Sequence, residues 1–139
     1  MPLLDHVVLQ VDDLKAIGDW YDQVVGLAGG TRTFDLPNLI GYALPGAPAQ
    51  LFFSLATDPG GRRTHLALAV ADEVTVRRGH EFATAAGAEI LHEPRLWPEY
   101  GPEYYAVFIR DPAGNNLELK CRASTAQPTH PDMTEEHPS

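Results

Sequence analysis

The sequence predicts an α+β fold in which a βαβββ module occurs twice. The first sign is an order of elements: the apolar, β-branched segment LDHVVLQV precedes a helical pattern and three short strand patterns, and this order then returns. The second is sequence similarity between the two halves: LDHVVLQVDD aligns with THLALAVADE, and this alignment superposes His6 on His65. The third is an ungapped match of residues 42–52 to residues 108–118. Two such halves usually pack about a pseudo-twofold axis, since neither can bury its sheet face alone.

The first module is expected to take residues 1–58. Its opening strand at 4–11 leads to Asp12 and Asp13, which offer an N-cap. The helix expected over 14–25 has its apolar residues at helical spacing, and glycines end it. Three strand-like pieces separated by proline-containing turns follow, at about 31–35, 38–44 and 49–55.

The second module is expected to take residues 59–121. A strand at 64–70 precedes a helix over 71–86, which a glycine ends. The loop at 93–101 is rich in proline and aromatic residues. The remaining residues, 122–139, are polar and rich in proline, and are expected to be a disordered tail or an arm ordered only by a partner. The other strands of this module are expected at 88–92, 104–109 and 116–121.

Composition narrows the partners and the compartment. The 139 residues suit one domain or two tightly joined half-domains, and the formal net charge is −9. A surface this acidic repels phosphate backbones and anionic lipid, so nucleic acid and membrane are poor candidate partners. No apolar run approaches the ~20 residues that a membrane helix needs, and no signal peptide is visible. The single cysteine, Cys121, fits a reducing compartment, so we expect a cytoplasmic protein.

Three side chains form a candidate metal site. His6 and His65 occupy the same place in two equivalent strands, and Glu118 lies in the last strand between Leu117 and Leu119. A carboxylate in a core-forming strand is costly to bury unpaired, and a metal ion shared with two imidazoles would meet that cost. Two histidines and a carboxylate leave positions open on the ion, where a substrate chelates. The alternatives are histidines that are hydrogen-bonded core residues, and a surface-facing Glu118 on an edge strand.

These residues resemble the glyoxalase / bleomycin-resistance / extradiol-dioxygenase superfamily, whose members are also called vicinal oxygen chelate proteins. The resemblance covers about residues 3–121 and rests on LDHVVLQVDDL, a helix containing Trp20-Tyr21, THLALAV, and the ending YYAVFIRDPAGNNLELK. It implies paired βαβββ modules whose curled mixed sheets surround a cavity, with the helices outside. It also implies a divalent metal ion (Fe(II), Mn, Zn, Ni or Co) at His6, His65 and Glu118. Members often form homodimers.

Within the superfamily, this chain departs from several patterns. Glyoxalase I and methylmalonyl-CoA epimerase types carry a fourth ligand where the internal alignment puts Phe52; a register shift by two would instead supply Gln50. Extradiol dioxygenases have a tyrosine ten residues before the ligand glutamate, where this chain has Phe108. Tyr104 lies two strand steps away on the same face and is a possible substitute.

Two further classes of the superfamily fit less well. Fosfomycin-resistance enzymes are similar in length and ligand spacing, but they have a threonine at the position of Val8 and a serine-rich potassium loop where this chain has residues 97–101. An acidic, proline-rich loop is a poor phosphonate site. Bleomycin-binding members usually lack the metal triad, so the complete triad argues against that class.

Other side chains have two interpretations each. His92 is expected to end its strand, either lining the cavity as a proton shuttle or exposed to solvent. Tyr104 is interpreted as a hydrogen-bond donor to a bound oxygen or as core packing. Trp97 and Tyr100 are interpreted as a lid, a pocket wall or a dimer contact. A catalytic role for Cys121 is disfavoured.

The sequence therefore favours a metal-dependent enzyme acting on a small oxygen-chelating substrate, with dioxygenase-like or lyase/isomerase-like chemistry. Tyr104 and His92 would move protons. The alternative is a small-molecule-binding resistance protein without catalysis. The residues expected to contact the small-molecule substrate are Phe52, Gln50, Trp97, Tyr100 and Phe108.

Overall fold

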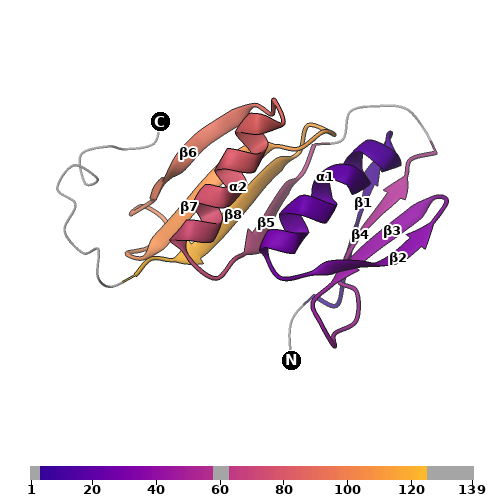
Figure 1. Cartoon of the computed structure of the whole chain (residues 1–139), viewed down its shortest axis with the longest axis horizontal. Coiled ribbons are helices and arrows are strands. Elements are labelled where there is room, and N and C mark those ends of the chain that lie inside the picture. Colours follow the sequence, from indigo (N-terminus) through magenta and orange to yellow (C-terminus); the bar gives the residue numbers. More distant parts are fainter. Residues whose placement is uncertain (1–3, 58–62, 125–139) are drawn as a thin grey trace. The chain divides into compact units, whose positions relative to one another are not determined.

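The computed structural model describes residues 4–57 and 63–124 of the chain. Contacts divide the chain into two compact units, residues 1–64 with 111–115 and residues 65–110 with 116–139. Each unit holds one helix and a four-stranded mixed sheet, so the predicted α+β fold of two βαβββ modules is confirmed (Figure 1). No helix within the described ranges is long and apolar enough to cross a membrane. In chain order the elements are β1 (Val7–Val11), α1 (Leu14–Leu27), β2 (Thr31–Leu36), β3 (Leu39–Ala43), β4 (Leu51–Leu55), β5 (His65–Ala69), α2 (Glu73–Ala85), β6 (Ile90–Leu96), β7 (Tyr104–Arg110) and β8 (Asn116–Arg122).

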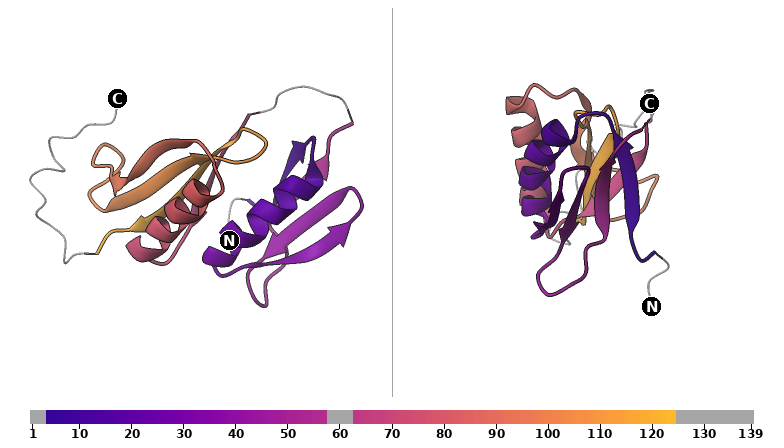
Figure 2. Two further views of the ribbon diagram at one scale, coloured as in Figure 1. Left: turned by 45° about the horizontal axis from the view of Figure 1, so that its top comes forward. Right: turned by 90° about the vertical axis from the view of Figure 1, so that its right-hand side faces the viewer.

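The first sheet has the strand order β1-β4-β3-β2, with β1 parallel to β4 and the other neighbours antiparallel. α1 begins where the sequence predicts it, because the Asp13 carboxylate accepts a hydrogen bond from the Ala16 amide at 3.0 Å. The buried face of α1 includes Tyr21, whose ring packs against Phe53 of β4 at a centroid distance of 4.5 Å. The helix therefore covers one face of its own sheet and leaves the other face without a helix from this unit (Figure 2).

The second sheet repeats this plan with the strand order β5-β8-β7-β6. Asp72 caps α2 by accepting a hydrogen bond from the Thr75 amide at 2.9 Å. α2 packs on β7, β8 and β6, against the face that carries the fully buried Leu117 and Leu119. Because strand residues alternate between faces, Glu118 points to the face away from α2, which we call the open face of the second unit.

Strand register agrees with the internal sequence alignment. The parallel pair β1 and β4 places Val8 opposite Phe52, and the parallel pair β5 and β8 places Ala67 opposite Glu118. His6 lies two residues before Val8, and His65 lies two residues before Ala67. Phe52 of the first module therefore occupies the position that Glu118 occupies in the second, as the ungapped alignment predicts.

Most strand bounds differ from the predicted ones by one to three residues, and β6 differs most. The strand expected over 88–92 continues to Leu96 as β6, so His92 lies inside it and not at its end. The register shifts between His92 and Arg95, which marks a β-bulge around Pro94. β6 is an edge strand, where the missing N–H of a proline removes no necessary ladder bond. A proline more often indicates a loop than a strand, which is why the predicted strand is too short.

The Asp-Pro-Ala-Gly turn between β7 and β8 belongs to the first unit. The buried Asp111 accepts a hydrogen bond from the Tyr21 hydroxyl of α1 at 2.6 Å. Asp111 also accepts a hydrogen bond from the side-chain amide (Nδ2) of Asn115 at 2.9 Å. Two backbone amides donate to it as well, that of Asn115 at 2.8 Å and that of Ala113 at 2.9 Å. Burial and the nearby Asp111 carboxylate raise the pKa of Tyr21 well above its ordinary value. This turn is therefore held by a residue ninety positions earlier in the chain.

The C-terminal end of β8 is tied to α2. Ser124 is the last described residue, and its amide donates to the buried Glu73 at 2.9 Å. β8 itself extends to Arg122. From residue 125 onward, the segment expected to be a tail lies outside the described residues.

Candidate functional site

Glu118 lies in β8, an interior strand between β5 and β7. Its side chain points to the open face, with Ala67 of β5 and Phe108 of β7 as its cross-strand neighbours. The residue is only 3% exposed. The alternative of a surface-facing Glu118 on an edge strand is therefore wrong. A carboxylate this buried destabilises the fold unless its oxygens have partners.

Each carboxylate oxygen of Glu118 has its own partner. His65 Nε2 lies 2.8 Å from Oε1, and the Tyr104 hydroxyl donates to Oε2. The His65 side chain is 52% exposed, so it joins the buried carboxylate to solvent. We refer to His65, Glu118 and Tyr104 as the Glu118 cluster. Two of its members were expected to be metal ligands and the third a proton donor, and all three lie in one unit.

The Tyr104 ring contacts two further side chains of this unit. The Lys120 ammonium lies 4.5 Å from the centroid of the Tyr104 ring. The Tyr100 ring meets the Tyr104 ring edge-on, with 5.4 Å between their centroids. Burial, followed by the hydrogen bond to Glu118, raises the pKa of Tyr104 to about 12. The phenol therefore keeps its proton at neutral pH and donates to the carboxylate.

His6 immediately precedes β1 in the first unit. Its side chain is 51% exposed, and its Nδ1 lies 2.8 Å from Asp5 Oδ1. The His6 ring meets the Phe52 ring edge-on at 5.7 Å. Gln50 is exposed, and the β1–β4 register has no shift that would bring it to the position of Phe52. In the first module an aromatic ring thus replaces the carboxylate beside the histidine.

Trp97 is buried against β7 and is not an exposed lid. It is 2% exposed, and its indole N–H donates to the Ala106 carbonyl of β7 at 3.1 Å. Tyr100 stacks on the indole at a centroid distance of 5.8 Å and is itself 58% exposed. Of this expected pair, only Tyr100 presents a large surface to solvent.

His92 stands apart from the Glu118 cluster. Its exposed ring meets Trp97 edge-on at 5.0 Å and Phe108 edge-on at 5.6 Å. Phe108 lies between His92 and Glu118 in the register of β6, β7 and β8. Two strand spacings amount to about 10 Å, so a proton moving between His92 and the carboxylate needs an intermediary such as water or substrate. Tyr104 alone of the two expected proton donors contacts Glu118.

The Glu118 cluster has donor chemistry that suits a divalent ion. Two ligand atoms that each lie about 2.1 Å from one ion are about 3 Å apart at adjacent octahedral positions and about 3.4 Å apart at tetrahedral positions. The 2.8 Å between His65 Nε2 and Glu118 Oε1 is close to the octahedral separation. Within 4–57 and 63–124, no group of three or more histidine, cysteine, aspartate or glutamate side chains gathers as a metal site. The described geometry thus supplies two of the three expected ligands, and His6 belongs to the other unit.

Comparison with known proteins decides the family. The sequence profile of the glyoxalase-like domain matches residues 6–120. The chain belongs to the glyoxalase-like domain family. No curated protein sequence matches it.

Solved structures of other proteins resemble this glyoxalase-like chain in fold. Lactoylglutathione lyase from Agrobacterium tumefaciens is 24% identical, with a TM-score of 0.64 over 86% of this chain and 94% of its own. A glyoxalase/bleomycin resistance protein from Albidiferax ferrireducens is 21% identical, with a TM-score of 0.72 over 87% of this chain and 100% of its own. A glyoxalase/bleomycin resistance protein/dioxygenase from Nocardioides is 20% identical, with a TM-score of 0.61 over 94% of this chain and 89% of its own. At these identities the likeness shows the fold alone.

Tyr104→Phe in this glyoxalase-like chain is expected to lower the affinity for a divalent ion about 10-fold or more. The variant removes the donor that orients Glu118, and partners of ligating groups typically contribute about 10- to 100-fold to metal affinity. Chelator competition measures the change. Tyr105→Phe is the matched control, because Tyr105 is on the opposite face of β7 and contacts Arg77 of α2. Equal affinities for wild type and both variants would contradict the orienting role.

The burial and the raised pKa of Cys121 disfavour a nucleophilic role for its thiol. It is buried, and burial followed by the charge of Glu73 raises its pKa to about 11. At pH 8 such a thiol is ionised roughly 100-fold less than an ordinary one. Iodoacetamide should therefore label Cys121 at least about 100-fold more slowly in the native protein than in guanidinium chloride. Similar rates in the two states would show an accessible thiol.

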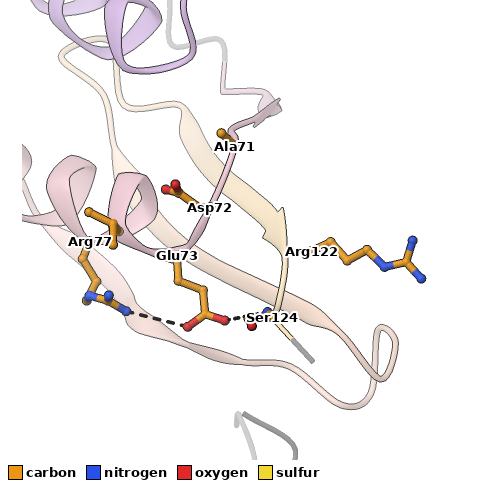
Figure 3. Close-up of a pocket in the computed structure, with 7 residues that line it drawn as sticks. Ala71, Asp72, Glu73, Arg77, Arg122 and Ser124 are labelled. Carbon is orange, nitrogen blue, oxygen red and sulfur yellow. Dashed lines mark hydrogen bonds and ion pairs between the residues drawn. The ribbon is translucent and has the colours of Figure 1, made fainter. Parts of the chain in front are cut away.

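A separate pocket lies at the start of α2 (Figure 3). Its volume is about 410 Å³. The Glu73 carboxylate holds Ser124 there and lies 3.8 Å from the Arg77 guanidinium. None of the predicted site residues lines this pocket, so it is distinct from the Glu118 cluster. It is lined by Ala71, Asp72, Glu73, Val74, Arg77, Arg122 and Ser124.

Proposed function

We propose that this glyoxalase-like chain is a metal-dependent enzyme that acts on a small oxygen-chelating substrate, by dioxygenase-like or lyase/isomerase-like chemistry. The observation that supports it most is the buried Glu118 carboxylate, whose Oε1 lies 2.8 Å from His65 Nε2 on the open face. His6, His65 and Glu118 would hold a divalent ion: Fe(II), Mn, Zn, Ni or Co. When bound, the ion supplies Lewis-acid stabilisation of a chelated substrate oxygen.

The chain's own residues have the remaining roles. Tyr104 orients Glu118 through Oε2 and is the proton donor nearest to the carboxylate. His92, on the far side of Phe108, exchanges protons with solvent or with a distal part of the substrate. The aromatic side chains of this face, with Phe52 and Gln50 of the first unit, would contact the substrate and exclude water.

Metal analysis tests the proposal. The protein is purified without a His tag, its bound metals are measured, and the ion is removed with a chelator. One of the five metals should be present at near one equivalent, and adding it back should raise the melting temperature, because a ligand that binds only the native state stabilises it. A protein with no stoichiometric metal, and no metal-dependent change in melting temperature, would contradict the proposal.

That outcome would favour a binding protein that sequesters a small aromatic compound. Its support is the 58% exposed Tyr100 ring, which meets Tyr104 edge-on at 5.4 Å and gives a planar ligand a surface to stack on. Binding of aromatic compounds with equal affinity before and after chelator treatment would distinguish this function from the enzyme.

The proposed setting follows from composition and from the family. A homodimer in the cytoplasm is the assembly we propose, with a small molecule as substrate and neither nucleic acid nor membrane as partner. The net charge of −9 and the one free, buried cysteine support this setting. Sedimentation equilibrium tests the oligomeric state, and a monomer at micromolar concentration would contradict the dimer.

A further inference from the structure

Lys120 is a cation set beside the Glu118 cluster. It is half-buried in β8, two residues after Glu118 and on the same open face. Its cross-strand neighbours are Ala69 of β5 and Ala106 of β7, neither of which carries charge. The ammonium lies 4.5 Å from the centroid of the Tyr104 ring, and this cation–π contact holds it over the cluster.

The charge of Lys120 lacks a carboxylate partner among the described residues. No acidic side chain within those ranges forms an ion pair with its ammonium. The chain has nineteen acidic and ten basic residues, so this cation is left without a carboxylate partner although acidic side chains outnumber basic ones. Other basic residues that do form such pairs are Lys15, Arg32, Arg77 and Arg122.

An anion would meet this unpaired charge. The net charge of −9 repels anions from the protein as a whole, so an anionic ligand needs a local cation to bind. We propose that the substrate carries a carboxylate, and that Lys120 binds it about one two-residue strand step, roughly 6–7 Å, from the metal-chelating oxygens. This inference rests on the proposed function, because the chelating oxygens are those bound at His6, His65 and Glu118. It makes Lys120 a specificity-determining residue.

The test compares two probes on the metal-loaded protein. The first is 3,4-dihydroxybenzoate, whose two hydroxyls chelate a metal and whose carboxylate lies across the ring from them. The second is its methyl ester, which has the same chelating pair without the charge. The ester withdraws electrons more strongly than the carboxylate and so favours chelation by the ester, which means that a preference for the acid reports the charge. An aromatic ring is a suitable spacer because the exposed Tyr100 stands beside Tyr104. Affinities are measured by calorimetry under nitrogen, with the metal that the wild type retains.

Wild-type protein should bind the acid about tenfold more tightly than the ester, and 0.5 M NaCl should reduce that preference. Lys120→Met should abolish the preference while leaving the affinity for the ester and for the metal unchanged. Lys120→Arg keeps the charge and should keep most of the preference. These three results together would support the assignment.

The contrary outcomes are distinguishable. If the protein binds metal but binds the acid and the ester with equal affinity, the carboxylate site is overturned and the proposed enzyme stands. The same conclusion follows if it binds metal and neither probe. A Lys120→Met variant that loses metal affinity as well as both probes would show that the lysine serves Glu118 and not a substrate. Absence of metal binding by wild-type protein would overturn both proposals.

Discussion

Replacing Glu118 with glutamine is expected to abolish metal stabilisation while leaving the metal-free fold nearly intact. Glutamine has almost the same volume, and its side-chain oxygen can still accept the Tyr104 hydroxyl bond. It lacks the negative charge that strengthens the binding of a divalent ion, so metal affinity should fall at least about 100-fold, beyond the effect typical of indirect partners. At a metal concentration 100 times the wild-type Kd, wild type gains about 2.7 kcal/mol, or roughly 10 °C in Tm, and Glu118→Gln should gain almost none.

The matched control for this variant is Glu81→Gln. Glu81 is exposed on α2, which packs on the opposite face of the sheet, so the same chemical change there should leave metal binding unaltered. Thermal unfolding of each variant, with and without metal, provides the measurement. A Glu118→Gln protein that retains the full metal-dependent rise in Tm would remove Glu118 from the ligand set.

Asp111→Ala is expected to destabilise the protein by about 3 kcal/mol or more, which lowers Tm by roughly 10 °C. The reason is the number of buried donors that the variant leaves without an acceptor. Asp111 accepts bonds from the Tyr21 hydroxyl, from the Asn115 side chain and backbone, and from the Ala113 amide, and it is 4% exposed. Each buried donor left unsatisfied costs about 1–3 kcal/mol.

Two comparisons separate this network from a general effect of losing a carboxylate. Tyr21→Phe removes only one donor and should cost about 1 kcal/mol. Asp35→Ala removes an exposed carboxylate that has a 3.4 Å contact with Arg32, and its free energy of unfolding should stay within about 0.5 kcal/mol of wild type. Urea unfolding measures all three. An Asp111→Ala loss no larger than that of Asp35→Ala would show that the turn is not held by this network.

The fold was largely predictable because it depends on local periodicity and on repetition. The match between the two halves placed Phe52 over Glu118, and the strand register agrees with it, because Phe52 pairs with Val8 as Glu118 pairs with Ala67. The extent of β6 was not predictable in the same way. Pro94 is a strand breaker in an interior strand and is tolerated at an edge, and only the assembled sheet determines which position a strand takes.

The candidate site was predictable in its residue types and only partly in its contacts. Alternation along β8 indicated that Glu118 shares a face with Lys120, but neither the partner of each carboxylate oxygen nor the aromatic contact of Lys120 follows from alternation. Trp97 shows the same limit, because its place in a loop left a lid, a pocket wall and a dimer contact open, and the structure shows the indole buried against β7. The Asp111 network was missed, although an aspartate that starts a Pro-Ala-Gly turn is a signal for side-chain bonds to the following amides.

By itself the sequence determined the duplicated βαβββ plan, the equivalence of His6 and His65, and the glutamate that the second module has where the first has phenylalanine. These follow from periods of 2 and 3.6 residues and from letters repeated along one chain, which need no knowledge of distant contacts. Tertiary structure decided that Glu118 is buried between His65 and Tyr104, that Trp97 is buried against β7, and that Tyr21 holds Asp111. Those contacts join residues far apart in the chain, and which of them form depends on how the side chains of a whole unit fill its space.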